Sequence, residues 1–541
     1  MPGGTRPQYH GYRHPFVNGR LYHGVWDSPH TLVDQAMSKL SATLRQEPQW
    51  WNRVHDQDAR IEWTTKACNH TWTVRTPTDA IQVPLYLHQI NYVLDELEGY
   101  ANLCDTQNNC YPSCFERIWE RLLPQEEPLI VRLNRRLSSL RDEKAWRTNS
   151  DGTSTVDLID PFFHALVYTR TYAYDSENPK GLRPEPQPLK FDPENPVAVS
   201  KSFSCLPTDF KVSPTGTIKG ISYINDLHPR YTSLYDDIEN LLGATIPLFE
   251  HVLTDLHREN PMRRRIKAPL KLLGEPIPPD FSNDELGWAS YESRAREWVM
   301  NKPIQLPDVP SAGYTEGLEH RKHLVELRGR ALQFIIRVSD TRIEPGKTSY
   351  HPGSPWHVEG MKNERIVACA FYYLIAENLA DNHINFRMAV TAPQGDIDTI
   401  HRIYGLKKGD PCHQYVGSVP IHAGLCIAFP NIYQVQQTPI HLANPSQGGH
   451  QRVIQFFLVD PDIPPIISTS RVLPQQLRWM VDLIHSSHRF PLELSENIAK
   501  EVDGLLSKEE AEKFRDQMIV NRTAYNMLCE LQYFCIPLNE P

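Results

Sequence analysis

Hydrophobic residues recur at three- and four-residue spacings over residues 30–145, which predicts amphipathic helices. The clearest stretches are "TLVDQAMSKLSATLRQ" (31–46), "FERIWERLLPQEEPLIVRLNRRLSSLRDEKAW" (115–146) and, further along, "SLYDDIENLLGATIPLFEHVLTDLHRE" (233–259). Helical spacing returns after residue 470, where Ser507 stands before two charged residues as a helix N-cap would. Helices are therefore expected on both sides of a central region.

The central region has a different pattern, with short apolar runs separated by Gly, Pro, Asn and Asp, as is typical of strands and tight turns. Its candidate strands are "QFIIRVSDTRI", "ERIVACAFYYL", "INFRMAV", "GLCIAFPN", "IYQVQQTPIHL" and "QRVIQFFLVD". Together they predict a β-sandwich or barrel over about residues 330–462. Upstream, "GTIKGISYINDLHP" (216–229) predicts a strand that ends in a proline turn, and the proline-rich residues 175–196 predict a surface loop.

A chain of 541 residues is longer than one compact core usually serves. The patterns divide it into a mainly helical N-terminal region (1–320), with loop straps and some strands that pack on the core, a β core (321–470) and a C-terminal helical extension (471–541).

The charge balance bears on possible partners. Lys and Arg total 56 against 65 Asp and Glu, a net charge of −9, which argues against a general affinity for polyanions. The basic run at 263–267 is accordingly interpreted as a solvated helix end rather than a nucleic-acid contact. The longest nearly apolar run, "IVACAFYYLIA", is about half of what a membrane span needs. Neither nucleic acid nor membrane is expected as a partner, and a small molecule fits better.

The ten cysteines are mostly scattered singly, which favours reduced thiols, and the first residues contain no apolar stretch of a secretory signal. A cytoplasmic protein is expected. Cys104, Cys110 and Cys114 lie close together, but no second pair stands at a matching distance, so their spacing does not favour a structural zinc.

The stretch "SPWHVEG" (354–360) carries the main candidate chemistry, because it sets His357 and Glu359 two residues apart. On a strand, residues i and i+2 point to the same face, as two neighbouring ligands of one metal must. Two histidines and a carboxylate can hold non-haem Fe(II) on one face and leave the other open. The alternative is a hydrogen-bonded histidine beside Trp356 and a glutamate that is on the surface or ion-paired.

Several longer stretches carry a family resemblance: "SYINDLHP", "WHVEGMKNERIVACAFYYL", "INFRMAV", "GDPCHQYVGSV", "AFPNIYQ", "GGHQRVIQFFLVDP" and "RVLPQQ". Together they resemble the fungal proteins catalogued as domain of unknown function 4246, which are similar to Fe(II)- and 2-oxoglutarate-dependent oxygenases. The resemblance implies an α+β fold, in which N- and C-terminal helices wrap a double-stranded β-helix (jelly-roll, cupin-like) core.

The resemblance also implies that His357 and Glu359 are catalytic iron ligands. Members of the family usually read "FPNxxQHxVxPF", whereas this chain reads "FPNIYQVQQTPI", which puts Val435 where the distal histidine should stand. Three interpretations remain open. His441 replaces the missing ligand, if the strand is bulged; water or a side-chain amide, Gln434 or Gln437, completes the site; or the fold is kept without oxidation chemistry.

The cosubstrate position departs from the family as well, because the turn "GHRK" is "GHQR" here and Gln451 replaces the first basic residue. Glutamine offers no bidentate charge-assisted bond to a carboxylate. Arg452 is the candidate for the cosubstrate carboxylate, although one residue along a strand points to the other face. Arg387 is a second candidate, with an ion pair inside the barrel as its alternative, and Arg337 has the same two interpretations.

The resemblance therefore predicts an enzyme that oxidises a small molecule with Fe(II) and 2-oxoglutarate, in fungal secondary or amino-acid metabolism. The alternative is a non-redox cyclase or isomerase, or a binding protein, on the same fold with a degenerate iron site.

Overall fold

The computed structural model describes residues 27–144, 153–174, 181–188, 198–257, 259–266, 271–272, 276–279, 284–301, 304–315, 317–318, 320–346 and 352–538, with Tyr12, Arg13 and Pro15. Its helices are α1 (Leu32–Arg45), α2 (Trp50–Arg53), α3 (Gln57–Cys68), α4 (Leu87–Leu103), α5 (Pro128–Glu143), α6 (Thr232–Leu256), α7 (Glu285–Asn301), α8 (Ile397–Tyr404), α9 (Leu477–Ser486), α10 (Leu492–Lys500), α11 (Lys508–Cys529) and the π-helix η2 (Glu530–Phe534).

The strands of the two main sheets are β3 (Tyr111–Pro112), β4 (Trp119–Leu122), β5 (Thr153–Ile159), β10 (Thr208–Val212), β11 (Ile218–Gly220), β14 (Ala331–Ile343), β15 (Ile366–Glu377), β17 (His383–Ala389), β18 (His413–Pro420), β19 (Leu425–Pro430), β20 (Gln434–Gln437) and β22 (Gly449–Val459). Short strand pairs are β1 (Thr71–Arg75) with β2 (Ala80–Pro84), β6 (Leu166–Val167) with β9 (Phe203–Ser204), β7 (Tyr172–Tyr174) with β8 (Leu182–Pro184), β12 (Lys271–Leu272) with β13 (Ile304–Gln305), and β16 (Leu379–Ala380) with β21 (His441–Leu442).

The larger sheet joins strands that lie far apart in the chain. Its order is β11–β10–β14–β22–β15–β19–β4–β3, with β5 also paired to β14, and the neighbours are antiparallel. Its central strand β15 reads as an almost continuous apolar run, and nine of its residues from Ile366 onward are buried. Such a run is typical of a strand covered on both faces.

The smaller sheet has the order β18–β17–β20, and His357 extends it through a bridge to Val435. Its inner face packs on the larger sheet through aromatic rings. The ring centroid of Phe429 lies 5.1 Å from that of Phe371 and 5.2 Å from that of Phe386, both at steep angles. Edge-to-face contacts of this kind add to the burial of apolar surface, so the two sheets are closely packed where these three rings meet.

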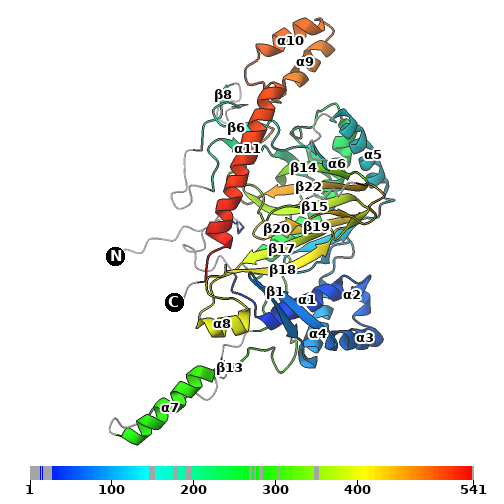
Figure 1. Ribbon diagram of the computed structural model, residues 1–541. Coiled ribbons are helices and arrows are strands. Elements are labelled where there is room, and N and C mark those ends of the chain that lie inside the picture. The colour runs from blue at the N-terminus through cyan, green and yellow to red at the C-terminus, as the bar shows by residue number, and fades with distance from the viewer. Residues whose placement is uncertain are drawn as a thin grey trace.

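Helices α5 and α6 pack on each other, and α6 contacts β15 and β19 of the larger sheet (Figure 1). The helix predicted over residues 233–259 is confirmed by α6. The helix predicted over residues 115–146 is confirmed only in its second half. Residues Trp119–Leu122 form β4, whose backbone pairs with β19, and α5 begins only at Pro128. Pairing with the edge of β19 here overrides the local helical pattern.

The N-terminal helices have a hydrophobic core of their own. Trp50 and Trp63 are almost fully buried between α1–α4 and the β1–β2 hairpin, and α1 also contacts β18 of the smaller sheet (Figure 1). The region predicted as mainly helical therefore also contributes strands, β3, β4, β5, β10 and β11, to the larger sheet.

The C-terminal helices are placed by one long helix. Figure 1 shows α11 running along the side of both sheets, with α9 and α10 packed on each other at one end. Ser507 begins α11 as predicted: its Oγ accepts a hydrogen bond from Glu510 N at 3.2 Å, and the Glu510 side chain accepts one from Ser507 N at 3.1 Å. This reciprocal arrangement satisfies two otherwise free backbone donors.

Two further expectations concern exposed segments. Of the predicted loop at 175–196, residues 175–180 and 189–196 lie outside the described residues, and residues 182–184 form β8. Within the described ranges, no helix combines the length and the apolar character that crossing a membrane requires.

A buried ion cluster ties the larger sheet to α5. Arg452 of β22 is fully buried, its Nε donates to Asp340 Oδ2 at 2.6 Å and its Nη1 donates to Asn134 O at 2.9 Å. Burial alone would raise the pKa of Asp340, but the hydrogen bond from His450 and the charges of Arg452 and Arg141 lower it to about 2. The side chain of Arg452 therefore lies on the outer face of the sheet, and the expectation that it meets a cosubstrate inside the barrel is corrected.

This cluster predicts that substitutions of Arg452 and His441, two residues predicted from the sequence to belong to one site, change the free energy of unfolding by very different amounts. Replacing Arg452 with leucine removes one of the buried cations that stabilise Asp340 and leaves Arg141 and His450 as its partners. The free energy of unfolding should therefore fall by about 3 kcal/mol, the lower end of what breaking a buried ion pair costs. Replacing the exposed His441 with alanine should change it by less than about 0.5 kcal/mol. Urea denaturation followed by circular dichroism measures both, and an Arg452→Leu protein as stable as the wild type would contradict the assignment.

Candidate functional site

The stretch 354–360 pairs with β20, which fixes the directions of its side chains. His357 N donates to Val435 O at 3.1 Å, and Val435 N donates to His357 O at 2.9 Å. Just upstream, Gly353 has φ +73°, and a Cβ there would lie 2.3 Å from Gln437 O. Only glycine permits this close approach of the two chains.

The structure brings His357 and Glu359 together. His357 Nε2 lies 3.3 Å from Glu359 Oε1, and the two side chains are 20% and 19% exposed. The other ring nitrogen, Nδ1, lies 2.8 Å from the carbonyl oxygen of Pro355. That carbonyl can only accept, so Nδ1 carries a proton and the ring is held with Nε2 toward Glu359.

Glu359 is held in place by Asn431, which follows the strand in "AFPN". Glu359 N donates to Asn431 Oδ1 at 2.8 Å, and Asn431 Nδ2 donates to Glu359 O at 2.8 Å and to Ile366 O at 3.0 Å. Asn431 is almost completely buried. This positioning role was not inferred from the sequence, where "FPN" served only to locate the position of the distal histidine.

The electrostatics of the pair favour its charged form. Burial alone would lower the pKa of His357, but the hydrogen bond and charge of Glu359 raise it above its ordinary value. Burial alone would raise the pKa of Glu359, but His357, Arg337 and Arg522 lower it. An imidazolium beside a carboxylate is therefore favoured over two neutral groups.

The position opposite His357 holds an aliphatic side chain. Val435 is the residue that exchanges both backbone hydrogen bonds with His357, so their side chains point to the same face. Phe386 of β17 is paired with Val435 and points the same way, so aromatic and aliphatic groups surround this side of the pair. Of the three donors that a facial iron triad requires, two are present, so the residues here do not fit the complete triad.

His441 is not brought to the pair. It is exposed in β21, which pairs with β16 outside the two main sheets, and β20 ends at Gln437. The glutamines are also engaged elsewhere: Gln434 Nε2 donates to Glu530 Oε2 at 2.7 Å, and Gln437 Nε2 donates to Gln451 Oε1 at 2.7 Å. The last bond places Gln451 on the inner face of the larger sheet, opposite to Arg452.

Arg387 does not face the pair either. It stands opposite Gln434 on β20, and its Nε donates to Gln434 Oε1 at 2.6 Å. Its guanidinium forms an ion pair with Glu530 of η2 and stacks 4.6 Å from the ring centroid of Trp356. Because Phe386 points inward, the next residue along the strand points outward, and the expectation that Arg387 binds a cosubstrate within the barrel is corrected.

Arg337 acts on the His357–Glu359 pair through its charge, which lowers the pKa of Glu359. Its Nη2 lies 3.0 Å from Asp157 Oδ2 and its Nε 3.2 Å from Oδ1. Arg515 of α11 reaches Asp160 at 2.5 Å. The sequence offered no signal for Asp157, Asp160 or Arg515, because β5 meets β14 and Arg515 of α11 only in the folded chain.

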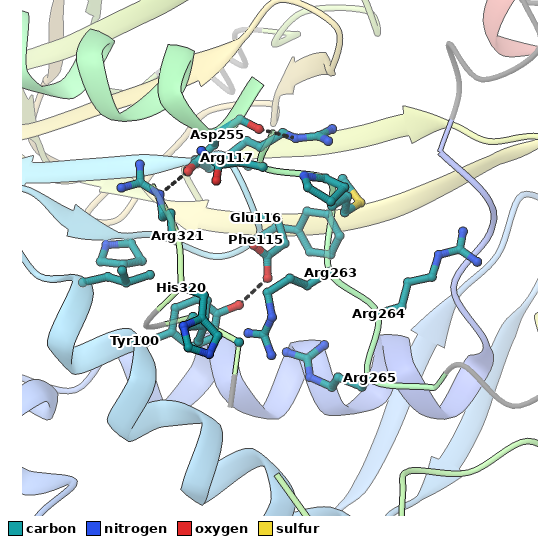
Figure 2. A pocket seen from close by; sticks show the side chains of 18 of the residues that line it. Tyr100, Phe115, Glu116, Arg117, Asp255, Arg263, Arg264, Arg265, His320 and Arg321 are labelled. Carbon is teal, nitrogen blue, oxygen red and sulfur yellow. Dashed lines mark hydrogen bonds and ion pairs between the residues drawn. The ribbon is translucent and has the colours of Figure 1, made fainter. Parts of the chain in front are cut away.

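A cavity of about 590 Å³ lies between the N-terminal helices, β4 and the end of α6 (Figure 2). Five arginines line it: Arg117, Arg263, Arg264, Arg265 and Arg321. Arg265 is buried and bound to Asp34 at 2.9 Å and Glu96 at 2.7 Å, and Arg321 is paired with Asp255. The interpretation of the basic run as a solvated helix end is therefore wrong for Arg265, which joins α1 to α4; Lys267 lies outside the described residues.

One group of possible metal-binding side chains occurs in the described part of the chain. The ligand atoms of Asp105, Cys110 and His251 lie within 4.8 Å of one another, and the other two cysteines of the "CDTQNNCYPSC" cluster do not take part. Burial and the charge of Arg321 lower the pKa of His251 to about 4, and burial raises the pKa of Cys110 well above its ordinary value. Arg321 Nη2 lies 3.4 Å from His251 Nδ1, which leaves the ring proton on Nε2, facing Asp105.

Helices and antiparallel sheets packed together define an α+β protein, with a His–Glu pair between its two main sheets. The chain belongs to the family described as "Protein of unknown function (DUF4246)", whose sequence profile matches residues 88–483. No curated protein matches.

Solved structures give slight likenesses. The Fe(II)/α-ketoglutarate-dependent dioxygenase TqaL aligns with 9% identity and a TM-score of 0.23, over 64% of this chain and 95% of that chain. EvdO2 from Micromonospora carbonacea, complexed with 2-oxoglutarate, aligns with 12% identity and a TM-score of 0.14, over 25% and 57%. A prolyl-4-hydroxylase from Pseudomonas putida aligns with 11% identity and a TM-score of 0.13, over 23% and 52%. Likenesses this slight carry no argument about the activity of the chain.

The raised pKa of His357 predicts a pH-dependent contribution to stability. Because the folded pKa lies above 6.5, the pair stabilises the fold fully below pH 6.5 and the contribution is lost as the pH rises through the folded pKa. The lowered pKa of Glu359 means that the contribution is also lost when the pH falls well below 4.5. His357→Gln should therefore cost more stability near pH 6 than near pH 9, in urea denaturation at both pH values.

Glu359→Gln is the matched variant, because it keeps the shape of the side chain and removes its charge. Burial remains while the charge is lost, so the pKa of His357 should fall to 6.5 or below. The imidazole carbon resonances of His357 in a ¹³C-labelled protein report this pKa. An unchanged pKa in the variant would show that Glu359 does not control the imidazole.

Proposed function

We propose that this chain is a small-molecule enzyme on a double-stranded β-helix scaffold, in which His357 and Glu359 transfer protons instead of holding iron. The strand order supports the scaffold. Counted along the chain, eight extended segments fall into one sheet of order 1-8-3-6 (β14, β22, β15, β19) and another of order 2-7-4-5 (354–360, β20, β17, β18). Two interleaved Greek keys of this kind make a jelly roll.

The observation that carries the proposal is the identity of the residue across from His357. Val435 occupies the place from which a third ligand would complete the metal site, and its side chain can neither donate nor accept. The other candidates for that place, His441, Gln434 and Gln437, have their side chains exposed or engaged elsewhere. Two protein ligands would bind Fe(II) weakly.

The pair has what proton transfer needs. Pro355 O fixes the imidazole through Nδ1, and Nε2 faces Glu359 with its proton. A partly exposed imidazolium can give this proton to a substrate as a general acid, while Glu359 stabilises the charge and takes a proton back as a base. Such steps are sufficient for an isomerisation or a cyclisation of a small molecule.

A second candidate function is an Fe(II)- and 2-oxoglutarate-dependent oxidation of a small molecule. The orientation of the two side chains favours it. Nε2 of His357 and Oε1 of Glu359 lie 3.3 Å apart, close enough to bind one metal ion. Nδ1 of His357 is bonded to a backbone carbonyl, as the second ring nitrogen of a metal-binding histidine usually is. When bound, iron and 2-oxoglutarate would supply the activation of O₂. This function requires a third donor that is not among the described neighbours of His357.

Metal binding separates the two candidates. Wild-type protein titrated anaerobically with Fe(II), or with Co(II) as a spectroscopic substitute, should bind less than one ion per chain and form no succinate from 2-oxoglutarate. Val435→His supplies the missing donor and should bind one ion more than about 100-fold tighter, a larger effect than loss of an outer-shell partner causes. Val435→Ala is the matched control and should behave as the wild type.

Each of the two titrations, of the wild type and of Val435→His, has an outcome that would contradict the proposal. Stoichiometric iron in the wild type, with succinate formation that Glu359→Gln abolishes, would replace the proton-transfer proposal with the oxygenase. A gain of affinity in Val435→His that survives His357→Ala would show that the new ion binds elsewhere.

A further inference from the structure

A cavity of about 420 Å³ lies beside the turn in "SYINDLHP", between α5, the start of α9 and the start of α11. Its lining includes His228 and Tyr231 from this turn, with Gln476 and Trp479 from the C-terminal region. Two further lining residues, His164 and Asp226, each have φ +61°, a left-handed conformation that costs energy in any residue with a Cβ. Such strain is held by the structure around it and gathers at binding sites.

Gln476 is the residue that points to a ligand. It is 5% exposed, and neither its Oε1 nor its Nε2 has a hydrogen-bond partner among the described protein atoms. Its neighbour Gln475 is equally buried but fully bonded: its Oε1 accepts from Thr171 Oγ1 at 2.7 Å, and its Nε2 donates to His164 O at 2.8 Å and to Ala165 O at 3.3 Å. An unsatisfied buried amide destabilises the fold, so a retained one implies a partner.

Six of the charged groups in the walls are paired with one another, and the seventh, Lys508, lies 3.8 Å from Glu512. Arg230 reaches Glu143 at 2.7 Å, Lys144 reaches Asp226 at 3.1 Å, and Arg478 reaches Asp482 at 3.1 Å. With these pairs formed, no charge of the walls requires a counter-ion, which favours an uncharged occupant.

His228 adds a neutral donor. Its Nδ1 accepts a hydrogen bond from Arg230 N at 2.9 Å, so the ring proton is on Nε2. Burial and the charge of Arg230 lower the pKa of His228, which keeps the ring uncharged at neutral pH. The ring centroid of Trp479 lies 4.9 Å from that of His228, so an aromatic surface stands beside the donor.

We propose that this cavity binds an uncharged, planar small molecule that carries a neighbouring N–H donor and C=O acceptor, an amide or a lactam. The polar atoms of Gln476 are closed off from solvent here, so its side chain turns toward the cavity to pair with both groups of the ligand, and the flat body of the ligand packs beside Trp479. The site is separate from the His357–Glu359 pair and does not depend on the function of that pair.

Benzamide is the probe, and benzoate, its charged isostere, is the comparison. Isothermal titration calorimetry and saturation-transfer NMR with the full chain should show that benzamide binds in the millimolar range or tighter, and benzoate at least tenfold more weakly. Gln476→Met keeps the length of the side chain and removes both polar atoms. It should lower benzamide affinity at least tenfold without lowering the thermal unfolding temperature.

Gln475→Met is the matched control, because Gln475 does not line the cavity and its three hydrogen bonds hold neighbouring backbone in place. It should lower the unfolding temperature, and it should lower benzamide affinity less than Gln476→Met does at a temperature where both proteins are folded. Failure of benzamide to bind the wild type, equal binding of benzoate, or undiminished binding by Gln476→Met would each overturn the proposal; in the first case water alone occupies the cavity. Should Gln476→Met not fold, Gln476→Glu provides the same test with the acceptors kept and the donors removed.

Discussion

The two backbone hydrogen bonds between His357 and Val435 determine the geometry of the site. They join the stretch 354–360 to β20 and thereby close the smaller sheet, and they decide which side chains face inward. Once this register is set, His357 and Glu359 share a face, Val435 stands across from them, and Arg387 is turned to the outside. A one-residue slip would exchange every one of these positions. The candidate chemistry is thus a property of strand pairing as much as of residue type.

Much of the fold could be predicted from the sequence, because local periodicity reports local burial. Each of the six candidate strands overlaps a strand of the structure, and α1, α6 and α11 lie where the helical spacing predicted them. β4 could not be predicted, since "WERL" has helical spacing and becomes a strand only through pairing with the distant β19. β18 was recognised within a family motif but not as a strand.

The site was predicted in part, and for a related reason. The spacing of His357 and Glu359 is a local signal, whereas Asn431, Arg337 and Asp157 act through contacts between segments 70 to 180 residues apart. The face of Arg452 is likewise set by Asp340, which lies 112 residues earlier. Successive side chains on a strand point to opposite faces. If Gln451 and Phe386 had first been assigned to the interior, this alternation would have predicted that Arg452 and Arg387 point outward.

The ion pairs of α11 have a consequence for how the protein folds. Glu364 is completely buried just before β15 and pairs with Arg522, and Asp160 at the end of β5 pairs with Arg515. Every strand of the two main sheets precedes α11 in the chain. Packing the sheets together before α11 docks would bury these two carboxylates without their cations, which costs several kcal/mol. Docking of α11 is therefore coupled to the final packing of the two sheets.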